Sequence, residues 1–267
     1  MLKPVPSSTW PDSWRASFEY DRKEIFGEQT RSGYAYAYAA RRKAVLDLVR
    51  RIARPGATVL DVAAAQGNFT LTLAEMGYEV TWNDLREELA GYVKLKYERG
   101  TVHFAPGNLF TTRFSGQFDL VLATEIIEHV AHPDQFLMRV AALVKPSGYI
   151  VMTTPNGEYF RNRLPRFSDC EDPSAFEAVQ FKPNSDGHIF LLHEDELNVI
   201  ARQSGVSIVE CRLLSNPLTS GHIKLGRVLP FFPTRLVLGL ERLTQKGPLP
   251  LRRKIHTTFA VLIRKAG

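Results

Sequence analysis

The sequence contains little cysteine and no long apolar run. Only two of its 267 residues are cysteines, Cys170 and Cys211, too few for a disulfide framework or a thiolate zinc site. The opening residues hold no apolar stretch of signal-peptide length, and no apolar run reaches the roughly 18 residues that a membrane-spanning helix needs. These absences exclude the small disulfide-rich secreted class, and we expect a cytoplasmic protein.

Acidic residues are scarce at the C-terminal end. Residues 218–267 contain ten Lys/Arg and a single acid, Glu241, whereas the other 217 residues contain 24 Lys/Arg and 27 Asp/Glu. The net charge of +6 therefore comes from a basic C-terminal segment attached to a slightly acidic body. This asymmetry does not favour nucleic acid as a partner, although the overall charge taken alone would.

Short apolar runs alternate with helical patterns along most of the chain. We expect strands at 57–63, 78–84, 101–108, 118–125, 148–156, 206–214 and 256–265. The helical patterns lie at 14–51, 68–77, 85–99, 132–146 and 193–205. Such alternation predicts an α/β fold: a doubly wound, Rossmann-like, mostly parallel seven-stranded sheet with an N-terminal helical cap.

The same pattern suggests one main domain. We expect residues 1–44 to form an N-terminal arm and helical cap, and residues 45–267 to form the domain, with insertions at 157–187 and 217–255. Long excursions in a compact α/β domain are usually lids or binding loops. The first insertion, together with Tyr34, Tyr36 and Tyr38, is a candidate for substrate walls, unless its aromatics only pack the loops onto the body.

The loop after the first expected strand is poor in glycine. It runs from Asp61 to Gly67, with Ala63 and Ala65 at its first two small positions. A dinucleotide fingerprint needs several glycines to bring the backbone against a pyrophosphate, so this loop counts against NAD or FAD. A loop of small residues still admits a ligand without a phosphate to cradle, such as S-adenosylmethionine.

Polar side chains end the next two expected strands. Asp84 ends the second, where a carboxylate can accept both ribose hydroxyls, and Asn108 ends the third, where an amide can meet an adenine edge. Acids and small residues also end strands that bind nothing. Three such features in order favour a nucleoside site.

These residues resemble the class I S-adenosylmethionine-dependent methyltransferases. The resemblance covers about residues 45–265, and the residues that carry it are VLDVAAAQGNFT (59–70), TWND (81–84), PGNLF (106–110), FDLVLATEIIEHV (118–130) and LVKPSGYIVMTTPN (143–156). The family has glycines where Ala63 and Ala65 stand, and commonly Asp where Asn108 stands. The resemblance implies S-adenosylmethionine as cofactor, bound by Asp61, Ala63, Ala65, Gly67, Asn83, Asp84, Asn108, Leu109 and Thr124.

An acidic and histidine-containing segment follows the fourth expected strand. On a helical turn, Glu125, Glu128 and His129 would share one side. The segment resembles that of ubiquinone-biosynthesis-type O-methyltransferases and of small-RNA 3′-terminal 2′-O-methyltransferases. The second resemblance implies that these three residues and His188 bind Mg²⁺ or Mn²⁺. The alternatives are metal-free catalysis by His129 and Glu125, with the imidazole as general base, or a structural role.

The sequence thus predicts an S-adenosylmethionine-dependent methyltransferase that acts on a small-molecule acceptor, through a quinol-like or sugar hydroxyl. RNA 3′-end 2′-O-methylation and a non-catalytic methyltransferase-like binding protein remain alternatives. Residues 223–254 alternate apolar clusters with single basic residues. This pattern fits a helix on a membrane surface, a helix covering the sheet, or a dimer interface, and the oligomeric state stays open.

Overall fold

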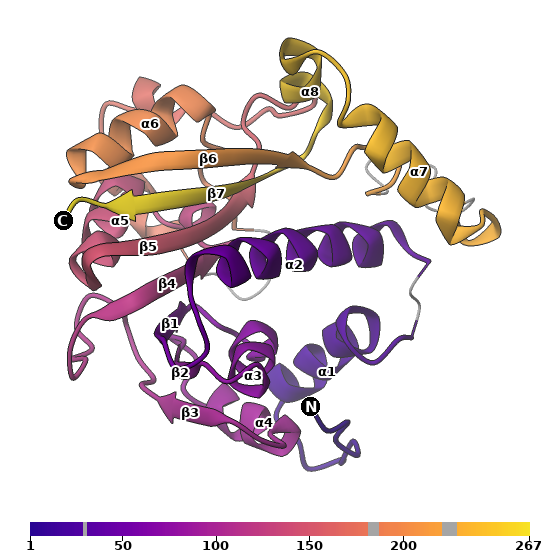
Figure 1. The fold of residues 1–267 in the computed structure, drawn as a ribbon, viewed down its shortest axis with the longest axis vertical. Coiled ribbons are helices and arrows are strands. Elements are labelled where there is room, and N and C mark those ends of the chain that lie inside the picture. Colours follow the sequence, from indigo (N-terminus) through magenta and orange to yellow (C-terminus); the bar gives the residue numbers. More distant parts are fainter. Residues whose placement is uncertain (29–30, 181–186, 221–228) are drawn as a thin grey trace.

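A computed structural model describes residues 1–28, 31–180, 187–220 and 229–267. Its centre is one seven-stranded sheet with the order β3-β2-β1-β4-β5-β7-β6 (Figure 1). The strands are β1 (Thr58–Val62), β2 (Glu79–Asn83), β3 (Thr101–Phe104), β4 (Phe118–Thr124), β5 (Val144–Pro155), β6 (Val206–Leu214) and β7 (Thr258–Lys265). β7 runs antiparallel between β5 and β6, and the other neighbours are parallel. The predicted α/β class and mostly parallel sheet are confirmed.

Helices precede the sheet and connect its strands. The α-helices are α1 (Asp12–Glu24), α2 (Gly33–Ile52), α3 (Asn68–Glu75), α4 (Leu89–Lys96), α5 (Pro133–Ala142), α6 (Glu194–Gln203), α7 (Thr234–Thr244) and α8 (Leu249–Ile255). Short 3₁₀ turns are η1 (Ile127–His129), η2 (Phe167–Asp169), η3 (Pro173–Val179) and η5 (Leu229–Phe231). The continuous helix expected over 14–51 is wrong. α1 ends at Glu24, and Ser32 starts α2 by accepting a hydrogen bond from the Ala35 N–H.

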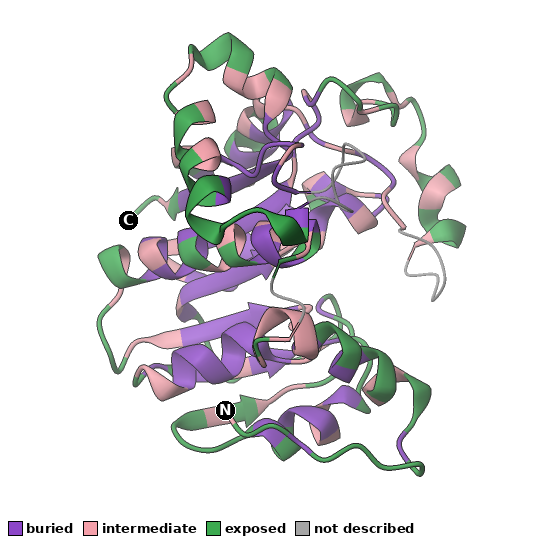
Figure 2. Cartoon of the chain, turned by 90° about the vertical axis from the view of Figure 1, so that its right-hand side faces the viewer, coloured by how far each residue is buried: buried purple, intermediate pink, exposed green. Residues whose placement is uncertain are grey.

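Alternation along the strands divides the core between the two faces of the sheet. On β4, Leu120 and Leu122 pack under α2 and α3, while Val121 and Ala123 pack under α5 and α6. Figure 2 shows the resulting buried sheet with exposed helices around it. α2 contributes Val45 to this core, so the predicted domain boundary after residue 44 falls within a single helix.

The two expected insertions lie outside this regular framework. The first contains η2 and η3, whose Phe167 and Phe176 stack edge-on against Phe190, and its residues 181–186 lie outside the described residues. The second contains α7 and α8, and its residues 221–228 likewise lie outside them. Of the helices in the described ranges, none is both long enough and apolar enough to cross a membrane.

Candidate active site

Two neighbouring cavities open at the carboxyl ends of β1 to β4. The smaller cavity has a volume of about 270 Å³ and the larger cavity about 510 Å³. Ala63, Leu85 and Ile126 line both, so the two adjoin. Ligands of open α/β sheets bind at this edge, where the strand order reverses on either side of β1.

The loop after β1 holds two alanines in a conformation that glycine prefers. Ala63 has φ 51° and Ala65 has φ 45°, and Trp82 Nε1 donates to the Ala65 carbonyl at 3.1 Å. The left-handed region costs a Cβ-bearing residue roughly 1–2 kcal/mol. Gly67 is also left-handed, and a Cβ there would lie 2.8 Å from Val93 Cγ2. The backbone thus keeps the path of a glycine-rich loop although two of its residues are alanine.

Asp84 anchors this loop from the end of β2. Its side chain is buried, and its Oδ2 accepts the Ala65 N–H at 2.8 Å. Its Oδ1 accepts the Arg86 backbone N–H at 2.9 Å and Arg86 Nε at 3.1 Å. Asp84 lines the larger cavity, as expected for a group that receives ribose hydroxyls, and the exposed Arg86 guanidinium shares the carboxylate.

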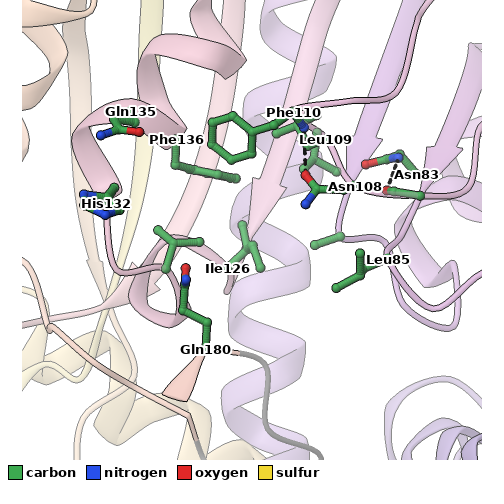
Figure 3. A pocket seen from close by; sticks show the side chains of 14 residues that line it. Asn83, Leu85, Asn108, Leu109, Phe110, Ile126, His132, Gln135, Phe136 and Gln180 are labelled. Atoms are coloured by element: carbon green, nitrogen blue, oxygen red, sulfur yellow. Dashed lines mark hydrogen bonds between the residues drawn. The ribbon is translucent and has the colours of Figure 1, made fainter. Parts of the chain in front are cut away.

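The smaller cavity has a polar edge and an apolar floor. Asn108 and Leu109 line it, and Asn108 Oδ1 accepts the Phe110 N–H at 2.9 Å. Asn83 also lines it, and its Nδ2 donates to the carbonyls of Ala105 and Gly107. Figure 3 shows His132 and Gln135 on the side opposite Asn83 and Leu85. Apolar walls with an amide at the rim suit a purine base.

Of two other residues expected to bind the cofactor, one lines a cavity and one does not. Thr124 lines the larger cavity at the end of β4. Asp61 lines neither cavity: it is buried under the loop, where its Oδ2 accepts Thr70 Oγ1 at 2.6 Å. Burial raises the pKa of Asp61 to about 7. Asp61 therefore contacts Thr70 on α3, at the base of the loop, and lines neither cavity.

Glu125 lines the larger cavity with His129, but it is not on a helical turn with Glu128 and His129. It has φ 52°, and the 3₁₀ turn η1 begins only at Ile127, so the helical spacing argument does not apply to it. Glu125 Oε2 instead accepts Arg41 Nη1 at 2.8 Å. Glu125 thus faces the larger cavity while it is paired with Arg41 of α2.

Glu128, His129 and His188 do come together. One ligand atom from each lies within 4.8 Å of the others, and the two imidazole rings are 4.8 Å apart at their centroids. The Ile189 N–H donates to the Glu128 carbonyl at 2.8 Å, which fixes the second histidine beside η1. His129 lines the larger cavity, and Glu128 is fully buried behind it.

Burial raises the pKa of Glu128 well above its ordinary value, and the nearby charge of Glu125 raises it further. Thr154 Oγ1 donates to Glu128 Oε2 at 3.0 Å, while Oε1 has no hydrogen-bond partner among the described residues. Glu128 Oε1 lies 3.9 Å from His129 Nε2. A carboxyl in this position can orient the imidazole ring, or bind a cation together with it.

A model of the methyltransferase domain family matches residues 36–211, which include all of β1 to β5. The chain belongs to this family. It is a class I S-adenosylmethionine-dependent methyltransferase, in agreement with the resemblance seen in its sequence. Membership implies S-adenosylmethionine as the cofactor, and the two cavities lie where such a nucleoside is expected.

Known relatives of this methyltransferase include ubiquinone biosynthesis O-methyltransferases. The protein of Aromatoleum aromaticum is 29% identical over 181 residues, which are 61% of this chain and 70% of that protein. The protein of Bordetella avium is 34% identical over 175 residues, 61% of this chain and 68% of that protein. The magnesium protoporphyrin IX methyltransferase of Synechocystis, solved with bound SAH, has a TM-score of 0.52 at 13% identity, covering 86% of this chain and 85% of that one. This last likeness shows a shared fold.

The N-terminal helices supply residues of the methyltransferase site that the sequence did not single out. Glu24 and Arg41 line the larger cavity, together with Tyr38, which was expected as a substrate wall. Glu24 Oε2 accepts Asn68 Nδ2 at 2.7 Å, and its burial raises its pKa. A charged residue on an isolated helix carries no signal that it faces a site, so only the packing of α1 and α2 reveals these two.

The other expected substrate walls mostly lie elsewhere. Tyr36 packs against Leu229 and Val237, and Tyr34 donates its hydroxyl to Glu24. In the described part of the 157–187 insertion, only Gln180 and Gly187 line the two cavities. Its three arginines line neither of the two cavities, and Arg166 pairs with Asp195 at 2.6 Å.

Proposed function

We propose that the protein transfers the methyl group of S-adenosylmethionine to a hydroxyl of a small molecule, with a quinol-like ring as the first acceptor class to test. The observation that carries this proposal is the position of His129, which lines the larger cavity and is backed by buried Glu128 and by His188. The names of the relatives from Aromatoleum aromaticum and Bordetella avium support a hydroxyl as acceptor.

The two cavities match the two ends of the cofactor. The smaller cavity offers apolar walls and Asn108 to the adenine, and Asp84 offers its carboxylate to the ribose. The methionine end carries an ammonium and a carboxylate. Glu24 and Arg41 line the larger cavity with opposite charges, so they complement that end.

The chemistry needs a base and a fixed line of attack. The His129 imidazole takes the proton of the acceptor hydroxyl, the general-base role that histidine fills most often in enzymes. The oxygen then forms a bond to the methyl carbon while the carbon–sulfur bond breaks, and its electron pair stays on sulfur. Holding the oxygen in line with that bond supplies much of the rate.

A divalent cation fits three of the four expected ligands. Glu128, His129 and His188 present a carboxylate oxygen and two imidazole nitrogens to one another, whereas Glu125 is engaged by Arg41. These three residues would hold Mg²⁺ or Mn²⁺, and such a cation would lower the pKa of the acceptor hydroxyl. If a cation takes part, a chelator abolishes activity and added metal restores it; unchanged activity in the chelator removes this version.

Calorimetric titration with S-adenosylmethionine and S-adenosylhomocysteine tests the proposal first. We expect saturable binding of both, followed by methyl transfer to a catechol-type acceptor in a mass-spectrometric assay. A protein that binds neither nucleoside overturns the proposal. Transfer to the 3′ end of a short RNA, with binding that weakens steeply as salt rises, would replace it with the RNA alternative.

A further inference from the structure

Helix α7 has one side that faces the body of the protein. Val237 on this side is buried with Tyr36 and Leu229 in a small apolar cluster. Glu241 accepts the backbone N–H groups of Ser215 and Asn216 at 2.8 and 3.1 Å. The only acid of residues 218–267 is therefore turned inward and held there by hydrogen bonds.

The outward part of α7 and η5 is divided between apolar and basic side chains. A helix advances about 100° per residue, which places Leu236 and Leu243 on one side and the basic residues on the adjoining side, while Leu238, 44% exposed, lies beyond the basic side. The apolar side carries Phe232, Leu236 and Leu243, which are 47%, 62% and 66% exposed. The basic side carries the exposed Arg235, Arg242 and Lys246.

The neighbouring elements extend the same chemistry. Phe231 in η5 is 84% exposed, and Leu249 and Leu251 at the start of α8 are 48% and 53% exposed. Lys254 is exposed beside them. Figure 1 shows α7 and α8 projecting beyond the sheet, with α7 near the start of α2. Exposed apolar side chains gathered on one projecting arm indicate an interaction surface.

We propose that α7 lies on an anionic lipid surface, with its apolar side in the acyl boundary and its basic side against the headgroup phosphates. A surface helix of this kind sinks its apolar side about 5–10 Å into the interface, and its long basic side chains reach the phosphates. The inward turn of Glu241 leaves the outer sides of α7 without an acidic side chain. A two-fold pairing of α7 with a second copy would bring the like charges of Arg235 and Arg242 together, so lipid is the better complement.

The arm is joined directly to the catalytic body. Tyr36 on α2 lies 3.5 Å, oxygen to oxygen, from Thr234 on α7, whereas Tyr38 and Arg41 of the same helix line the larger cavity. Lipid binding would therefore place the membrane on the outer side of α7, the helix that contacts the cavity-lining α2. The binding itself does not depend on methyl transfer, so the two proposals fail separately.

Vesicle flotation with the full-length protein tests this inference. We expect the protein to float with vesicles of phosphatidylcholine containing about 30% phosphatidylglycerol, and to float far less with phosphatidylcholine alone. Raised salt weakens the binding because it screens the basic side. Circular dichroism and thermal melting of each variant show whether it has folded.

Two variants separate the contributions of the two sides. Leu236→Glu/Leu243→Glu lowers the partition coefficient by about tenfold or more, since it places charge in the acyl boundary. Arg235→Gln/Arg242→Gln/Lys246→Gln lowers it by about fivefold for each residue and removes most of the salt dependence. Matched controls come from α6, where Val199 is 44% exposed and Arg202 is exposed: Val199→Glu and Arg202→Gln leave binding unchanged.

Three results overturn the inference. The first is absence of binding to the anionic vesicles. The second is undiminished binding by folded Leu236→Glu/Leu243→Glu. The third is a dimer in sedimentation, without vesicle binding, that dissociates in this variant; that result assigns the apolar side to a second copy of the chain.

Discussion

The half of the site that we propose for the nucleoside and the half that we propose for the acceptor are built in different ways. In the first half, the anchoring contacts join residues of one or two consecutive loops, such as Asp84 with Ala65 and Asn108 with Phe110. In the second half, the contacts join more distant parts of the chain, such as Thr154 with Glu128 and His129 with His188. A site built from residues close together in the chain can be predicted from the sequence, whereas a site built from distant residues depends on how the elements pack.

The largest expected effect falls on the acceptor half. His129→Ala should lower kcat by about 10²–10⁴-fold, because it removes the proposed base, and leave the Kd for S-adenosylmethionine unchanged. Single-turnover kinetics and calorimetry measure the two quantities. His103→Ala is the control, since His103 is exposed on β3 and pairs with Glu79. If His129→Ala retains full activity, neither the base nor the cation hypothesis survives.

The corresponding change in the cofactor half is Asp84→Ala. We expect the Kd for S-adenosylhomocysteine to rise by about 10²-fold, because charge-assisted hydrogen bonds to ribose are lost and the Ala65 N–H loses its acceptor. Glu87→Ala, an exposed carboxylate on the same loop, should leave the Kd unchanged. Equal affinity for Asp84→Ala and wild type in calorimetry would contradict the assignment of the ribose position.

Asp61 offers a test of how the cofactor half is held. Its pKa is about 7 in the folded protein against an ordinary value of 3.8, so folding takes up a proton between these pH values. Stability therefore falls as pH rises from about 4 to 7, by about 4 kcal/mol in total, at about 1.4 kcal/mol for each unit of the pKa shift. Asp61→Asn should lack this decline. Urea denaturation at several pH values measures the difference, and parallel curves for the two proteins would exclude a buried, protonated Asp61.

The smallest expected effect concerns the left-handed alanines. Ala65→Gly should raise the free energy of unfolding by about 0.5–1 kcal/mol, because glycine adopts φ 45° without the Cβ clash. Ala74→Gly, within helix α3, should instead destabilise the protein by about 1 kcal/mol. Thermal and urea unfolding measure the change in the free energy of unfolding for both substitutions. Destabilisation by both substitutions would show that the loop stores no strain.

The same contrast explains which sequence predictions succeeded. Strand ends are marked by local patterns, so Asp84, Asn83 and Asn108 were found at the cavities from β2 and β3 alone. The spacing argument for Glu125 was wrong in its geometry, because it assumed a helix where the backbone turns to φ 52°, although Glu125 does line the larger cavity with His129. Glu24 and Arg41 were missed, since no local pattern tells which face of α1 or α2 meets the site.

Three of the five described non-glycine residues with positive φ, Ala63, Ala65 and Glu125, line the larger cavity. Alanine codons begin with GC, glutamate codons with GA and glycine codons with GG. One nucleotide change therefore converts any of these residues to the residue that its backbone prefers. In a selection for variants that accept other substrates, a single nucleotide change at any of these three positions would therefore make the backbone beside the larger cavity more flexible.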